Sequence, residues 1–250
     1  MVSTMLRSGK QTISTLLGVP ACLLAAAGVC LAAFFYLPRG IARGLLHEGG
    51  MVEAATVAFY IAAAAAAGWQ AARLRWTDGT LIGILLASFA MRELDFHTRF
   101  TSMGVLKSRY YLDSTIPAIQ KVFAALVLLG LLTLAVSVFV RNRRSFMRAI
   151  RSGYAPAWAV AVGVLCLPAS KAIDRAPALI RDHAPAPLLA DTRFAFLVIE
   201  ECMELAIPIL FLWALLVHRY APPPHGVKGL AGSAWPMGDR PGDALVRDSG

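Results

Sequence analysis

Charged residues are scarce in this chain. Asp, Glu, Lys and Arg make up 16% of its 250 residues, whereas an average soluble domain carries about 25%. Hydrophobic residues make up 58%, and the mean hydropathy is +0.62. This scarcity of charge excludes an ordinary soluble domain and predicts that most of the chain folds in lipid.

Motifs for redox, metal and nucleotide chemistry are also missing. The four cysteines Cys22, Cys30, Cys166 and Cys202 lie in apolar segments and form no C-x-x-C pair, so we interpret them as small apolar packing residues. The sequence contains no G-x-S-x-G, Walker A or G-x-G-x-x-G pattern. Nucleotide-driven chemistry is therefore not expected.

The net charge of +9 does not indicate nucleic acid, because the basic residues are scattered between apolar runs. We expect the lipid bilayer as the main partner and no nucleic acid. The densest basic run, RNRRSFMRAIR at 141–151, is predicted to be a cytoplasmic loop that could contact anionic lipids. A plain positively charged anchor explains the same run.

Long apolar runs are abundant and predict an all-α polytopic membrane protein. Spans of about 20 residues cross a bilayer, and a single domain over 1–220 accommodates six of them. The run at 13–37 is too long for a signal peptide and is kept as a helix. The tail at 221–250 is rich in Pro and Gly and is predicted to be disordered. The expected spans lie near 13–37, 51–74, 80–96, 115–140, 154–173 and 192–217.

The distribution of Lys and Arg predicts the orientation. With both termini in the cytoplasm, the inner segments carry 13 of these residues and the outer loops carry 9. We therefore expect a multi-pass protein of a bacterial-type inner membrane. The run Ala62 to Ala67, followed by Gly68, predicts a surface for close helix packing.

Ionisable residues fall inside or at the ends of these spans, where each unmatched charge costs roughly 2.5–3.5 kcal/mol. The predicted topology puts most of them in the outer half of the membrane, which predicts a polar site facing the periplasm. The members of this predicted site are Glu53, Arg92, Glu93, Asp95, Lys121, Lys171, Asp174, Glu200, Glu201 and Glu204.

Helical spacing refines this site. Glu200 and Glu204 are four residues apart, so with Glu201 they form one connected arc. Pro208 cannot donate a hydrogen bond to the carbonyl of Glu204, which leaves that oxygen free or simply bends the helix. Lys171 lies three residues before Asp174, which suggests an internal ion pair or a side chain reaching the interface.

Lys121 is expected to be the countercharge to the glutamates. Glu93 and His97 are four residues apart and could act together, and Arg92 and Asp95 could pair.

A divalent metal is one candidate cofactor. His97, Glu93 and Glu204 are the candidate ligands, and His47, His97 and His183 could form a zinc site with one open position. No H-x-x-x-H or H-E-x-x-H spacing supports that zinc site.

The segments MRELDFHTRFTSMGVLKSRYYL, PASKAIDR and FLVIEECMELAIPILF resemble those of a family of uncharacterised bacterial multi-pass inner-membrane proteins. The chain is also similar to the CREST superfamily of membrane hydrolases. This resemblance would imply that the protein is a metal-dependent hydrolase. The paired histidines on the last helix of that superfamily have no match here, and glutamates occupy the equivalent place.

Three functions remain open. The acidic site could handle a cation, a proton or a small solute. It could instead belong to a metal-dependent hydrolase acting on a lipid or lipid-linked substrate. The third alternative is an assembly subunit whose acidic helices pair with a partner protein in the membrane.

Overall fold

In the computed structural model, residues 21–29, 31–32, 34–36, 38–46, 49–74, 76–94, 96, 108–183 and 189–220 are described. They form helices and connecting turns, and no strand occurs among them, which confirms the all-α prediction. Residues 21–29, 31–32 and 34–36 are helical and precede the labelled elements. These elements are α2 (Arg39–Leu46), α3 (Met51–Leu74), α4 (Thr77–Glu93), α5 (Ser108–Leu112), α6 (Ala118–Arg151), α7 (Ala155–His183) and α8 (Ala190–Tyr220).

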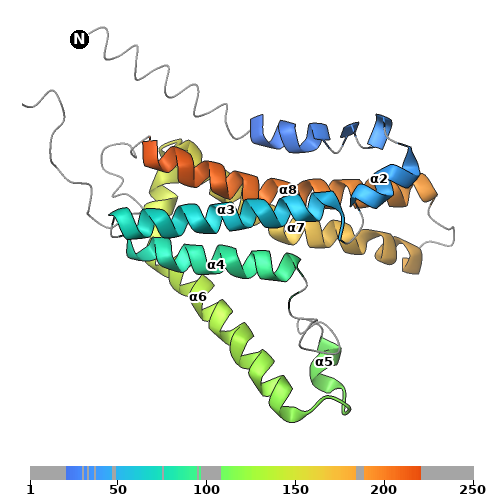
Figure 1. The fold of residues 1–250 in the computed structure, drawn as a ribbon, viewed down its shortest axis with the longest axis horizontal. Coiled ribbons are helices and arrows are strands. Elements are labelled where there is room, and N and C mark those ends of the chain that lie inside the picture. The colour runs from blue at the N-terminus through green and yellow to red at the C-terminus, as the bar shows by residue number, and fades with distance from the viewer. Residues whose placement is uncertain are drawn as a thin grey trace, which may run out of the picture.

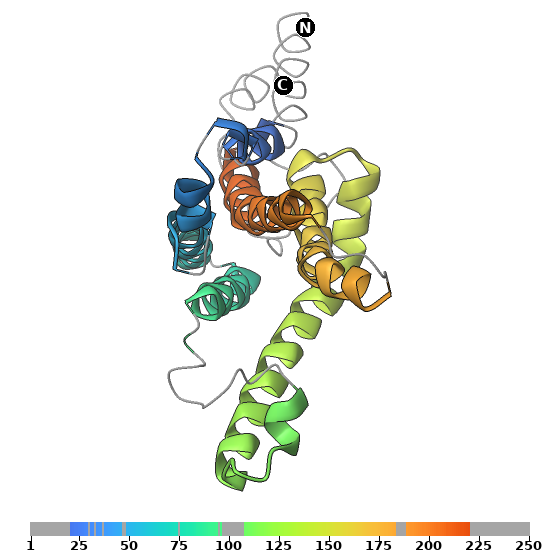
Figure 2. The same ribbon diagram turned by 90° about the vertical axis from the view of Figure 1, so that its right-hand side faces the viewer.

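Four helices form the packed body of the molecule. Helix α3 packs against α4 on one side and α8 on the other, and α8 packs against α7. Figure 1 shows these four helices side by side, with α6 running at an angle to them, and Figure 2 shows the same arrangement from the end. The resulting order is α4, α3, α8, α7.

The core of this body lies between α3, α4 and α8. Its buried members include Tyr60, Leu86, Ile207 and Phe211. Small residues bring the helices close: a Cβ added at Gly83 of α4 would lie 3.3 Å from the carbonyl oxygen of Ala64 on α3. The small-residue run of α3 therefore packs closely against α4, as its sequence predicted.

Three stretches are long and apolar enough to cross a membrane, namely Arg39–Arg73, Ala118–Arg151 and Ala155–His183. The second, which is α6, is the least covered by the rest of the chain. Its apolar side chains, such as Phe123 and Leu132, are exposed. Such a surface is expected where lipid tails surround a helix.

Helix boundaries follow the local sequence. Helix α3 covers the range that its apolar run predicted, 51–74. Helix α6 continues to Arg151, so the prediction of a loop at 141–151 is wrong. Arginine is a good helix former, and the helix stops only at Ser152 and at Gly153, whose φ of 71° suits glycine. Helix α7 likewise extends to His183, ten residues past its apolar part.

The cysteines do not all serve as packing residues. Cys22 and Cys166 are free and half-buried, but Cys202 on α8 is disulfide-bonded, which corrects its interpretation as an apolar packing residue. Its Sγ also lies 3.9 Å from the carbonyl oxygen of Ala26. Cys30 lies outside the described residues, as do the start of the first predicted span and the tail at 221–250.

Candidate functional site

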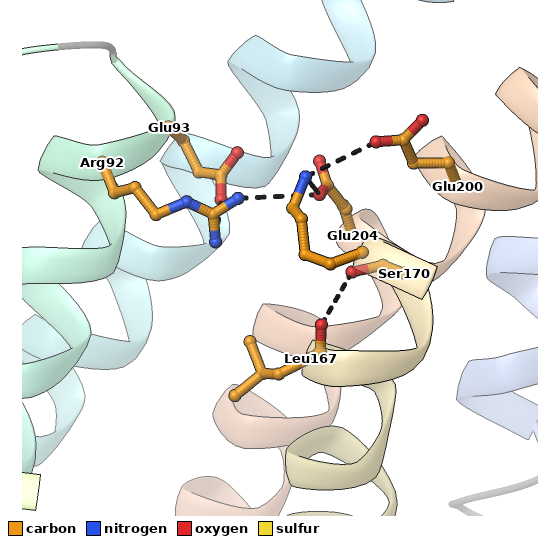
Figure 3. A network of polar contacts seen from close by, with 7 residues as sticks. Arg92, Glu93, Leu167, Ser170, Glu200 and Glu204 are labelled. Carbon is orange, nitrogen blue, oxygen red and sulfur yellow. Dashed lines mark hydrogen bonds and ion pairs between the residues drawn. The ribbon is translucent and has the colours of Figure 1, made fainter. Parts of the chain in front are cut away.

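Ionisable side chains from α4, α7 and α8 meet in one cluster, shown in Figure 3. Arg92 and Glu93 are the last two residues of α4. Lys171 lies in α7, three residues after Pro168, and Glu200 and Glu204 lie in α8 ahead of Pro208. The sequence predicted each of these five members, and the packing of α8 between α3 and α7 brings them together.

Glu204 is at the centre of the cluster. Its Oε1 lies 2.8 Å from Nζ of Lys171 and 3.7 Å from Nη2 of Arg92. Lys171 Nζ also lies 3.5 Å from Oε1 of Glu200, and Arg92 Nη1 lies 3.5 Å from Oε1 of Glu93. Two cations therefore connect three carboxylates that come from two different helices.

Burial differs between the acids and the bases of the cluster. The side chains of Glu93 and Glu204 are 9% and 14% exposed, whereas those of Arg92 and Lys171 are 31% and 43% exposed. Long basic side chains can keep their charge near water while their stems pack against apolar surface. The carboxylates thus lie deeper in the protein than the cations that neutralise them.

Glu201 has no cation of its own among the described residues. No ion pair or hydrogen bond joins it to another described side chain. Its electrostatic neighbours are the carboxylates of Glu204, Glu200, Glu53 and Glu93. A carboxylate in such surroundings must gain a proton, a cation or water to be tolerated.

Glu53 is near the cluster but has a structural task. Its Oε2 accepts a hydrogen bond from the backbone N–H of Gly49 at 2.6 Å. Glu53 is the third residue of α3, and a glutamate at this position commonly reaches back to the residues before the helix. The carboxylate therefore satisfies an N–H group that the start of the helix leaves open.

Two predicted contacts are replaced by others. Lys171 reaches across to Glu204 on α8, so the predicted internal pair with Asp174 does not form. Asp174 is exposed, although it lies near enough to Glu200 to interact with it. Lys121 stands near the start of α6, and no ion pair between it and the glutamates occurs in the described part of the chain. Arg92 and Lys171 supply the countercharge that we expected from Lys121.

The predicted metal ligands are only partly described. Asp95, His97 and His47 lie outside the described residues, so the set of His97, Glu93 and Glu204 stays a prediction. His183 is at the exposed end of α7, where its Nδ1 lies 2.8 Å from the carbonyl oxygen of Leu179. Across the ranges that the structure describes, no three His, Cys, Asp or Glu side chains have a metal-binding arrangement.

Sequence reasoning missed a second set of buried polar groups, at the other end of the packed helices. Asp78, at the start of α4, forms an ion pair with Nε of Arg141 at 3.2 Å. The hydroxyl group of Tyr154 is hydrogen-bonded to Nδ1 of His218 at 2.9 Å, and Gln70 Nε2 donates to the carbonyl oxygen of Leu215 at 2.9 Å. Of these residues, only Asp78 could have been noticed in the sequence, as an acid in the first turn of α4.

Compared with protein-family models, with curated proteins and with solved structures, the chain has no significant match. The predicted family resemblance therefore stays a prediction.

Proposed function

We propose that this chain is a six-span inner-membrane protein, with both termini in the cytoplasm, that takes up protons or small cations from the periplasm. The carboxylates Glu201, Glu204, Glu93 and Glu200 form the uptake site. Arg92 and Lys171 hold the acids together and limit their net charge.

The observation that carries this proposal is the surplus of acid around Glu201. In the part of the chain that the structure describes, the cluster contains four glutamates on α4 and α8 but only two basic residues. An unmatched carboxylate in a membrane protein is costly and typically marks an ion or proton pathway. Glu201 is therefore the residue that a proton or cation would neutralise.

The disulfide of Cys202 supports the periplasmic orientation of the site. Disulfides persist in oxidising compartments such as the bacterial periplasm and are rare in the cytosol. Cys202 is the residue directly after Glu201, so the bonded cysteine and the acid share one level of α8. The arginines at the end of α6 favour a cytoplasmic location for the opposite end.

The countercharges favour this function over that of an assembly subunit. Such a subunit would need a basic helix from a partner to neutralise its acids. Here Arg92 and Lys171 of the same chain already pair with Glu204, Glu93 and Glu200, so of the four glutamates of the cluster Glu201 alone is left for a partner to neutralise.

Uptake into liposomes tests the proposal. We expect the reconstituted protein to acidify or load the lumen, measured with a pH-sensitive or cation-sensitive dye, under an imposed gradient. Glu201→Gln should abolish this flux, because the amide cannot bind a proton or carry charge. Asp182→Asn is the matched control, since Asp182 is exposed near the end of α7 and pairs with Arg181. Equal flux in wild type and Glu201→Gln would refute the proposed site.

A further inference from the structure

The last three turns of α6 carry a line of arginines. Arg141, Arg144, Arg148 and Arg151 are separated by three, four and three residues. This spacing puts them on one face of a helix, and all four are exposed. We call these four residues the arginine stripe.

The hydrophobic packing of the same turns is on a different face. Ala149 is buried against Tyr154 and Ala157. Arg143, by its helical position, also lies away from the stripe. Arg144, Arg148 and Arg151 therefore lie on the outward side of a helix whose inward side is fixed by packing, whereas Arg141 reaches toward α4.

The ion pair of Arg141 locates the stripe along the molecule. Its partner, Asp78, is the second residue of α4, close to the turn between α3 and α4. Figure 1 shows the last turns of α6 at this end of the packed helices, where α4 begins and α8 ends. The stripe thus begins where the membrane-spanning part of the molecule stops.

Apolar and aromatic groups adjoin the stripe. Phe139 and Val140, directly before Arg141, are exposed. Trp158 is also exposed, and its Nε1 donates a hydrogen bond to the carbonyl oxygen of Ile150 at 3.2 Å. Tryptophan is enriched at the level of lipid headgroups, so these neighbours place the stripe at the membrane surface.

We propose that Arg144, Arg148 and Arg151 bind the phosphate group of an anionic phospholipid in the cytoplasmic leaflet. Guanidinium groups recognise phosphate through paired hydrogen bonds. The three arginines span about 10 Å along the helix at 1.5 Å per residue, which is enough to contact one headgroup from two sides. Arg148 Nε donates to the carbonyl oxygen of Arg144 at 3.2 Å, which holds its side chain along the helix.

A lipid is the occupant that the surroundings favour. Exposed apolar side chains before the stripe provide a place for acyl chains, whereas inorganic phosphate would gain nothing from them. This inference does not depend on the uptake function, because the stripe lies at the opposite end of the bundle from Glu201.

Lipid binding by the purified full chain tests the inference. We would measure the affinity for phosphatidylglycerol and for phosphatidylcholine by native mass spectrometry in a mild detergent. Each basic residue near an anionic surface strengthens binding roughly fivefold, so R144Q/R151Q should weaken phosphatidylglycerol binding roughly 25-fold. Phosphatidylcholine should bind weakly to both proteins.

The control removes the same charge elsewhere. R143Q/R175Q changes two exposed arginines outside the stripe and should leave phosphatidylglycerol binding within about twofold of wild type. An equal loss in both double variants would show a general charge effect and overturn the inference. No loss in either variant would show that the stripe does not bind the lipid and would overturn it as well. Displacement of the lipid by millimolar inorganic phosphate would also overturn it, by showing a site for free phosphate. If the double variant does not accumulate, phosphatidylglycerol binding is compared between wild type and the single variants R144Q and R151Q instead.

Discussion

At the scale of single residues, Glu204 has a structural role besides its proposed role in uptake. It is the carboxylate that joins Arg92 of α4 to Lys171 of α7, and it lies deeper than either cation. Removing one member of a buried pair leaves the remaining charges without compensation, which usually costs more than the pair contributes. Every neutral substitution at Glu204 removes this compensation, but one that retains an oxygen still offers Lys171 a hydrogen-bond acceptor.

We expect Glu204→Ala to lower the free energy of unfolding by about 1–3 kcal/mol, less than for a fully buried pair because Lys171 is 43% exposed and screened by solvent. Glu204→Gln keeps an oxygen acceptor for Lys171 and should cost less than half as much. The measurement is thermal unfolding in detergent by intrinsic fluorescence. If alanine and glutamine prove equally harmful, the charge of Glu204 accounts for the whole effect, and the predicted benefit of a retained oxygen acceptor is wrong.

The sequence was sufficient to predict which residues belong to the candidate site, but not which of them form ion pairs with one another. Glu200, Glu201 and Glu204 were recognisable because charges inside an apolar run are costly. That Lys171 would contact α8 rather than Asp174 depends on the packing of α7 against α8, which no local pattern contains. The ion pair of Asp78 with Arg141 escaped prediction for the same reason, since 63 residues separate the two.

At the scale of elements, apolar runs predicted the helices better than they predicted their ends. Helix α3 was predicted accurately because two glycines precede it and a basic residue ends its apolar run. Helices α6 and α7 were predicted too short because hydropathy records where lipid ends, whereas a helix continues until a breaker such as Gly153. The end of the apolar run and the end of the helix have different physical causes, and the sequence-based prediction treated them as the same position.

The contact between α7 and α8 provides an element-scale prediction. A Cβ added at Gly163 of α7 would lie 2.7 Å from the ring of Phe211 on α8. Overpacking of this kind costs about 1–3 kcal/mol, so Gly163→Ala should lower the unfolding temperature. The double variant with Phe211→Leu should recover part of the loss, because the clashing ring carbon is removed.

Gly130 is the matched control for this substitution. It lies inside α6, and nothing is within 4 Å of the position of an added Cβ. Gly130→Ala should be neutral or stabilising by up to about 1 kcal/mol, the helix propensity that alanine gains over glycine. A Gly163→Ala variant as stable as Gly130→Ala would mean that Phe211 of α8 does not lie against Gly163 of α7.

At the scale of the whole molecule, polar groups occupy the two ends of the packed helices and an apolar core separates them. The glutamates, Arg92 and Lys171 occupy one end. Asp78 with Arg141 and Tyr154 with His218 occupy the other. The core around Tyr60, Leu86 and Phe211 lies between them. This arrangement would let the acidic site exchange with one side of a membrane while the core closes off the other.

The orientation of the whole chain can be tested independently of any activity. If six spans cross the membrane with both termini inside, a fluorescent protein fused after Tyr220 should fluoresce, because it folds in the cytoplasm. Alkaline phosphatase inserted after Asp113, in the segment before α6, should be active, because that segment would lie in the periplasm. The α6–α7 turn at Ser152 and Gly153 serves as the internal control and should report the cytoplasm. The reverse pattern at all three positions would mean that the protein has the opposite orientation. The disulfide of Cys202 and the glutamates would then lie on the cytoplasmic side, which would contradict uptake from the periplasm.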